Sequence, residues 1–284
     1  MITVVKSEIL RVLKRRNLII AFFLLIGFML QGYYSYKNMG YVVREESAYV
    51  AYISTLSSNN AYIIGVLPLI TCLIAADSLA WDRKTGYVRF MLTRSQRRDY
   101  ILGKIAAVSV ITAAVVLLGF LFSFVLAAVL YPLRLPSWHW VGNVATFTIP
   151  EAPADYVNPV PVFLHNLFFT HPFIYVMIIT IIVTLAAVAY ANVALLLSLW
   201  TSNIYLVLAV PWLLHVGLNF VFGVLAVITN KDFAAFSPIV LTGAFIDHGN
   251  DPGKIYVPII WITTILLAAT VTYVLFMKRR DILD

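Results

Sequence analysis

Six long apolar runs constrain the fold of this 284-residue chain more than any other feature of its sequence. A helix that crosses a hydrocarbon layer of about 30 Å needs roughly 20 apolar residues, and each run is close to or above that length. Runs such as LIIAFFLLIGFML are apolar on every face, whereas strands of a membrane barrel alternate apolar and polar residues. The sequence therefore predicts an all-α integral membrane protein. Its six predicted transmembrane helices cover residues 18–36, 61–80, 105–131, 172–199, 205–229 and 256–277.

The distribution of basic residues predicts which side of the membrane each loop faces. The segments 1–17, 81–104 and 278–284 hold 15 of the 20 lysine and arginine residues. Cytoplasmic segments carry the excess of basic residues, so both chain ends are predicted to be cytoplasmic. The net charge of +7 then lies mostly at the inner leaflet, where it suits anionic lipids rather than nucleic acid. The predicted outer loops cover residues 37–60, 132–171 and 230–255.

Residues 1–17 predict an amphipathic helix lying in the inner membrane interface, ahead of a single transmembrane domain over 18–284. Apolar residues recur there at helical spacing, with basic residues roughly opposite. A basic tail that only sets topology, with accidental periodicity, is the alternative. The apolar positions are Ile2, Val5, Ile9, Val12 and Leu13, and the basic ones are Lys6, Arg11, Lys14, Arg15 and Arg16.

The second and fourth apolar runs carry residues with specific structural expectations. Pro68 predicts a kink in the second run, and Asp77 lies about one turn from its inner end. The Asp77 carboxylate either reaches the interface and pairs there or takes part in an ion relay. In the fourth run, small residues on one face favour close helix packing, within one subunit or between two. These residues are Ala187, Ala191 and Ala194.

Two outer segments are predicted to be partly ordered. The long 132–171 loop is expected to hold a helix in PVFLHNLFF, residues 161–169, because a structureless loop of that length is uncommon. The stretch FAAFSPIVLTGAF, residues 233–245, is too short to cross the membrane and return as full helices. It is therefore predicted to be re-entrant or interfacial.

The sequence offers no residues that assemble into a recognisable catalytic, cofactor or metal site. His165 and His171 are six residues apart, which does not place them on one helix face for a metal ion. His215, in the fifth run, is expected to hydrogen-bond to a neighbouring helix. Cys72 is the only cysteine, so an intrachain disulfide is excluded. An intramembrane enzyme that uses His215 or the outer histidines stays an alternative.

The segment Trp81–Lys104 carries nine charged residues among 24 and separates two apolar runs. At roughly 3 kcal/mol for each charge, burial in hydrocarbon would cost tens of kcal/mol, so the segment is expected to protrude into the cytoplasm. Within it, GYVRFML predicts a two-turn helix whose face of Tyr87, Phe90 and Met91 suits a groove on a partner. Thr93 or Ser95, with Gln96, is expected to cap the next helix.

These features together resemble the membrane subunits of type-2 ABC exporters. That family has an acidic-basic cluster, a glycine, a short apolar helix, a basic turn and an apolar-Gly-Lys sequence between its second and third spans. This chain matches that order over 82–104, although Asp82 stands where a glutamate is frequent and Tyr87 where a threonine is. The resemblance implies a coupling helix that docks into an ATPase subunit. The implied docking residues are Asp82, Gly86, Tyr87, Val88, Phe90, Met91, Leu92 and Arg94.

By the same resemblance, the chain is expected to be a permease subunit in a bacterial or archaeal plasma membrane. Two cytoplasmic ATPase subunits would bind ATP and Mg²⁺, while this chain would carry no cofactor and no catalytic residue. A second copy, or a similar permease, would complete the transport pathway. The apolar outer parts favour export of an amphipathic peptide, a lipid-linked molecule or a drug, as in resistance to antimicrobial peptides. A membrane scaffold that recruits a soluble partner through the 81–104 segment is the main alternative.

Overall fold

A computed structural model gives the architecture of the chain. Most of the residues that the structure describes are helical, as the apolar runs predict. The structure describes residues 2–38, 47–56, 63–76, 78–135, 139–141, 144–146, 164–229, 233–243 and 256–278.

Five of the described helices are long and apolar enough to cross a membrane. A sixth crossing is present if the bent pair Ile63–Ile74 and Ser78–Lys84 is taken as one span. The chain is thus an all-α, multi-pass membrane protein, as its composition predicts. The five long helices are α2 (Arg16–Asn38), α7 (Arg97–Leu130), α9 (Pro172–Leu197), α10 (Ile204–Thr229) and α12 (Tyr256–Lys278).

The second apolar run is broken rather than continuous. It consists of α4 (Ile63–Thr71), the π-helical turn η1 (Cys72–Ala76) and α5 (Ser78–Lys84), and the two arms differ in direction by 41°. Pro68 lies inside α4, where its missing N–H weakens the helical ladder, and the π-helical turn follows it. The change of direction lies between Ile74 and Ser78 rather than at Pro68, where the sequence predicts a kink. Asp77 lies outside the described residues.

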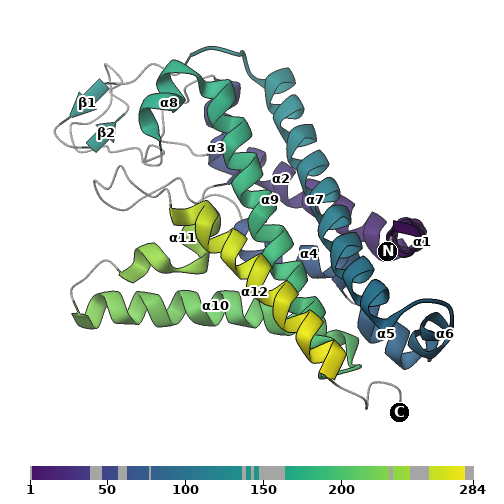
Figure 1. Cartoon of the computed structure of the whole chain (residues 1–284). Coiled ribbons are helices and arrows are strands. Elements are labelled where there is room, and N and C mark those ends of the chain that lie inside the picture. The colour runs from purple at the N-terminus through teal and green to yellow at the C-terminus, as the bar shows by residue number, and fades with distance from the viewer. Residues whose placement is uncertain are drawn as a thin grey trace.

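The shorter elements gather at two opposite ends of the long helices (Figure 1). Helices α7 and α9 run side by side through its middle, and α12 packs across α9. At one end lie α1 (Ile2–Leu13), α5, α6 (Tyr87–Arg94) and the last turn of α12. At the other end lie α3 (Ala48–Thr55), α8 (His165–Thr170) and a hairpin of β1 (His139–Val141) and β2 (Val144–Thr146).

Two outer segments differ in part from the prediction. Helix α8 begins inside the stretch expected to be helical and ends one residue beyond it, whereas the antiparallel hairpin, in which Val141 pairs with Val144, is not predicted by the sequence analysis. The segment expected to be re-entrant forms η2 (Phe233–Phe236) and α11 (Pro238–Gly243), both packed against α10. Residues 244 and 245 of that segment lie outside the described part of the chain.

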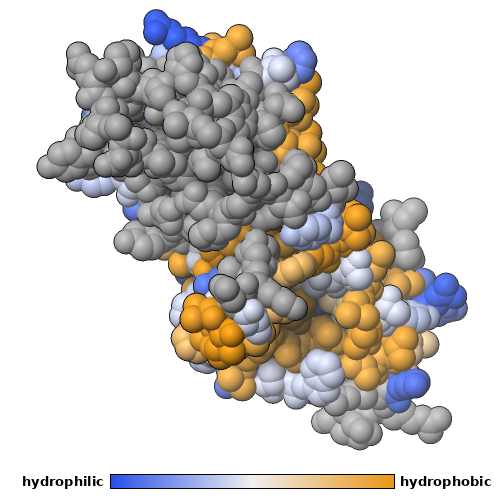
Figure 2. All heavy atoms as spheres, turned by 90° about the vertical axis from the view of Figure 1, so that its left-hand side faces the viewer, coloured by the Kyte–Doolittle hydropathy of each residue, from blue (hydrophilic) through white to orange (hydrophobic). Residues whose placement is uncertain are grey.

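Helix α9 forms the centre of the bundle and α10 lies at its edge. Ala187, Ala191 and Ala194 are fully buried, so their close packing takes place within one subunit. Across the whole of α10, which the structure describes in full, one narrow stripe is buried: Val207, Pro211 and His215. Apolar residues dominate much of the described surface in Figure 2, as expected for helices that face lipid.

Candidate functional site

Helix α6 stands between α5 and α7 because turns at both of its ends reverse the chain. Gly86 precedes it with φ of 71°, a left-handed conformation that glycine adopts without the strain a Cβ would cause. At its other end, Ser95 donates its hydroxyl to the carbonyl of Met91 at 2.9 Å. The predicted cap of the next helix is wrong, because Thr93 donates back to Phe90 and α7 begins at Arg97.

One side of α6 is an exposed aromatic surface framed by arginine. Phe90 has 48% of its area exposed, and its ring lies 6.0 Å from that of Tyr87. The guanidinium group of Arg94 lies over the Phe90 ring at 4.3 Å, and that of Arg11 lies over the Tyr87 ring at 4.7 Å. Cations over aromatic faces hold both in place. We name Tyr87, Phe90 and Arg94 the docking face.

The docking face is narrower than the set of residues predicted from the sequence. Val88 is 1% exposed and packs into the hydrophobic core, so its side chain is not available to a partner. Met91 and Leu92 are partly buried against the same core. Asp82 is fully buried and contacts other residues of this chain. These four residues support the docking face from beneath, because they occupy the inner side of α5 and α6.

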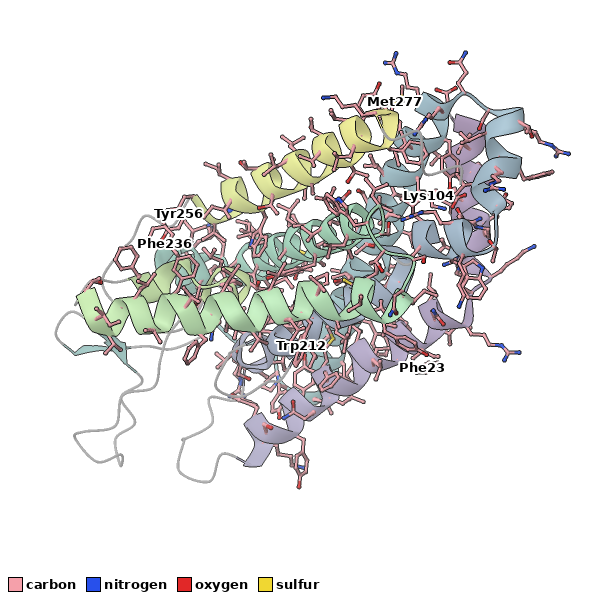
Figure 3. The ribbon with its side chains drawn as sticks, turned by 90° about the horizontal axis from the view of Figure 1, so that it is seen from below. Phe23, Lys104, Trp212, Phe236, Tyr256 and Met277 are labelled. Atoms are coloured by element: carbon pink, nitrogen blue, oxygen red, sulfur yellow. The ribbon has the colours of Figure 1, made fainter. Side chains whose placement is uncertain are left out.

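Beneath α6, four charged side chains form a buried ion cluster: Glu8, Arg11, Asp82 and Lys104. Arg11 lies 2.7 Å from Asp82 and 2.9 Å from Glu8. The Lys104 ammonium group donates to Glu8 at 2.9 Å and also pairs with Asp82. Both Asp82 and Lys104 are fully enclosed. Figure 3 shows Lys104 on the side of the molecule where α1 and α5 meet α7.

The ion cluster is balanced, which explains how so much charge can be buried. Its two carboxylates and two basic groups sum to zero, and the Tyr100 hydroxyl donates a further hydrogen bond to Asp82 at 2.9 Å. Burial lowers the pKa of Arg11, but its hydrogen bond and attraction to Asp82 outweigh that effect and raise the pKa above its ordinary value. The ion pairs and hydrogen bonds of the cluster therefore join α1, α5 and α7.

Helix α1 packs directly on α7, a contact that the sequence analysis does not predict. Val4, Glu8 and Val12 point inward. A Cβ added at Gly103 would lie 2.8 Å from the Val4 side chain, so glycine at this position allows the close approach. Leu13, one of the predicted apolar positions, is 53% exposed, whereas Arg11, predicted on the basic side of the helix, pairs with Asp82. The other predicted interfacial bases face outward or are half-buried: Lys6, Lys14, Arg15 and Arg16.

Sequence reasoning missed Glu8 and gave Lys104 no structural role. The signal for Glu8 is its spacing: it lies four residues from both Val4 and Val12 and so shares their helix face. The signal for Lys104 is that it adjoins Gly103 at the start of an apolar run. Neither signal names the partner, because the two ion pairs that tie α1 to α5 and α7 join residues 71 and 96 positions apart in the sequence.

The described part of the chain places other polar groups away from this site. His215 shares a hydrogen bond of 2.6 Å between its Nδ1 and the hydroxyl of Tyr190, which joins α10 to α9 as expected for this histidine. Cys72 is buried, and its thiol donates to the carbonyl of Tyr190 at 3.9 Å. Among the described residues, no three His, Cys, Asp or Glu side chains lie close enough together to hold a metal ion.

Comparison with known proteins assigns the chain to a family. No curated protein matches the chain. A family described as "Protein of unknown function (DUF2705)" matches residues 17–283, which include all six apolar runs and the charged segment between the second and third. The match begins in the first turn of α2 and ends at residue 283. By this match over nearly its whole length, the chain belongs to the DUF2705 family.

Proposed function

We propose that this chain is the permease subunit of an ATP-driven membrane transporter and that a separate ATPase subunit binds its docking face. The observation that carries the proposal is α6, a two-turn helix that exposes Phe90 and rests on a buried ion cluster. An exposed aromatic side chain on a firmly held helix is typical of a contact that fills a partner's groove. The resemblance of residues 82–104 to the coupling helix of type-2 ABC exporters names the class of partner.

The chemistry of the docking face describes the groove that fits it. Phe90 and Tyr87 need an apolar floor, while the exposed Arg89 and Arg94 need acidic groups at the rim. ATP and Mg²⁺ would be bound by the partner. The role of this chain is then mechanical, because a displacement of α6 acts on α5 and α7, which flank it in the chain.

The proposed membrane arrangement has six spans, with the bent pair as the second one and both chain ends in the cytoplasm. It is supported by the 15 basic residues in the segments 1–17, 81–104 and 278–284 and by the position of α1, α6 and the last turn of α12 at one end. Helix α1 would lie in the inner interface, and η2 with α11 would form a re-entrant piece. The membrane would be a bacterial or archaeal plasma membrane.

The proposed cargo is amphipathic, a peptide, a lipid-linked molecule or a drug, and the proposed direction is export. Support comes from the apolar character of the chain and from the resemblance. A pathway would require two permeases, this chain with a second copy or with a similar permease, and two ATPase subunits. No step of the proposed cycle needs a reacting group on this chain.

The test is recovery of an ATPase with the chain from its native membrane. The tagged chain is purified in mild detergent, and the bound proteins are identified and assayed for ATP hydrolysis. We expect an ABC-type ATPase that is lost from Phe90→Glu, because a carboxylate cannot enter an apolar groove flanked by acidic groups. Phe236→Glu is the matched control, since Phe236 is 44% exposed and lies far from α6 (Figures 1 and 3).

Each outcome decides the proposal. Loss of the ATPase from Phe90→Glu but not from Phe236→Glu supports docking on α6. Equal binding to both variants contradicts the docking face. A soluble protein without ATPase activity that depends on Phe90 would support a scaffold instead of a transporter.

A further inference from the structure

Two arginines at the base of α6 bind the C-terminal ends of two other long helices. Arg83, on α5, donates Nη1 to the carbonyl of Ser198 at 2.8 Å and to that of Leu199 at 2.9 Å. Arg97, the first residue of α7, donates Nη2 to the carbonyl of Phe276, and its guanidinium group lies 5.0 Å from the centre of the Phe276 ring. Both arginines are half-buried.

These contacts have a clear physical basis. The last four carbonyls of a helix have no partner within the helix and carry the negative end of its dipole, so a cation that donates hydrogen bonds is favoured there. Ser198 directly follows α9, and Phe276 lies in the last turn of α12. The two arginines therefore cap α9 and α12, although the sequence assigns them to a solvated cytoplasmic loop.

Both caps lie on the elements that adjoin α6 in the chain. Arg83 is three residues before Gly86, and Arg97 is three residues after Arg94. The residue next to Arg83 is Asp82, which the ion cluster ties to α1 and α7. Helix α6 thus has polar connections to α9 through its N-terminal side and to α12 through its C-terminal side.

We infer that Arg83 and Arg97 are positioning residues that carry a displacement of α6 to the ends of α9 and α12, each to one helix. This inference rests on the proposed docking of an ATPase subunit on α6. Arg83 moves the turn that leads from α9 into α10, since Ser198 and Leu199 belong to that turn. Arg97 moves the end of α12, where the buried ring of Phe276 lies under its guanidinium group.

The test uses two reporter cysteines, one at each capped helix end, in a Cys72→Ala background. Ser202→Cys reports on the turn after α9, and Lys278→Cys reports on the end of α12; both native side chains are exposed. The complex with its ATPase is placed in nanodiscs, and the rate of maleimide labelling is measured with and without ATP. We expect ATP to change both rates in the otherwise unaltered complex.

The expected result is a crossed pattern. Arg83→Gln reduces the ATP-dependent change at residue 202 by at least about fivefold and spares the change at 278, whereas Arg97→Gln does the reverse. Arg83→Lys keeps the charge and restores part of the response at 202. Lys84→Gln and Arg98→Gln are controls, since each removes an exposed cation next to a capping arginine. ATPase binding is expected to be unchanged in all of these variants.

The alternatives are separable. An unchanged response at 202 in Arg83→Gln and at 278 in Arg97→Gln, with the ATPase bound, overturns this inference and leaves the proposed function intact. Loss of both responses in either variant, or no rescue by Arg83→Lys, indicates general destabilisation and also overturns it. Absence of any ATPase on the unaltered chain overturns the proposed function and this inference together.

Discussion

The balance of charge in the ion cluster predicts an unusual pattern of mutational effects. Lys104→Met leaves the cluster with a net charge of −1, and Asp82→Asn leaves it with +1. Because the removed partner was fully buried in both cases, each single change is expected to destabilise the fold by about 3–5 kcal/mol. The double variant keeps the Glu8–Arg11 pair and is neutral again. Its cost is therefore expected to fall short of the sum of the single costs by about 0.5–3 kcal/mol.

The measurement is a double-mutant cycle on the purified chain in detergent, with the helical signal followed during denaturant unfolding. Lys84→Met is the matched control, because Lys84 lies on the same short helix as Asp82 but is exposed. Its free energy of unfolding is expected to change by no more than about 0.5 kcal/mol. Strict additivity of Asp82→Asn and Lys104→Met, or single effects no larger than that of Lys84→Met, would refute a buried and coupled cluster.

Two further predictions test the seat of α1 and the burial of the only thiol. Gly103→Val is expected to displace α1 and to speed hydrogen exchange of residues 2–13, because the new side chain meets Val4. Gly27→Val is the control, since nothing lies within 4 Å of a Cβ added there. Equal exchange in both variants would contradict the close approach of α1 to α7. Cys72 is expected to resist maleimide in the folded chain and to react after denaturation in SDS; rapid labelling without SDS would show that it is not enclosed.

The long helices were predictable because each apolar run carries its own signal. A run such as 172–199 needs no knowledge of its neighbours to be assigned to a helix, and α9 covers Pro172–Leu197. The two-turn helix at 87–94 was predictable for the same reason, because its apolar spacing and the glycine before it are visible within a short stretch of sequence. The break between Ile74 and Ser78 was harder to place. Pro68 marks a weak point among the backbone hydrogen bonds of α4, but packing decides where the helix bends.

The polar contacts at the base of α6 were beyond sequence reasoning because each depends on a distant partner. Charge in a loop between two spans suggests solvation, yet Asp82 and Lys104 are enclosed and Arg83 binds the carbonyls of the two residues that follow α9. Only the fold brings Glu8 to within 2.9 Å of Lys104. For the same reason the predicted docking set was too broad: the resemblance implies Val88 as a docking residue, but Val88 is buried in the core while Phe90 stays exposed.

The ion cluster also fixes an order of events during synthesis. Glu8 and Arg11 leave the ribosome first; Asp82 follows 71 residues after its partner Arg11, and Lys104 follows 96 residues after its partner Glu8. Until the start of α7 has been made, α1 has no balanced site to occupy, and Glu8 can satisfy its charge only with Arg11 or with water. The first helix of the chain thus reaches its final place only after α5, α6 and the start of α7 have been made.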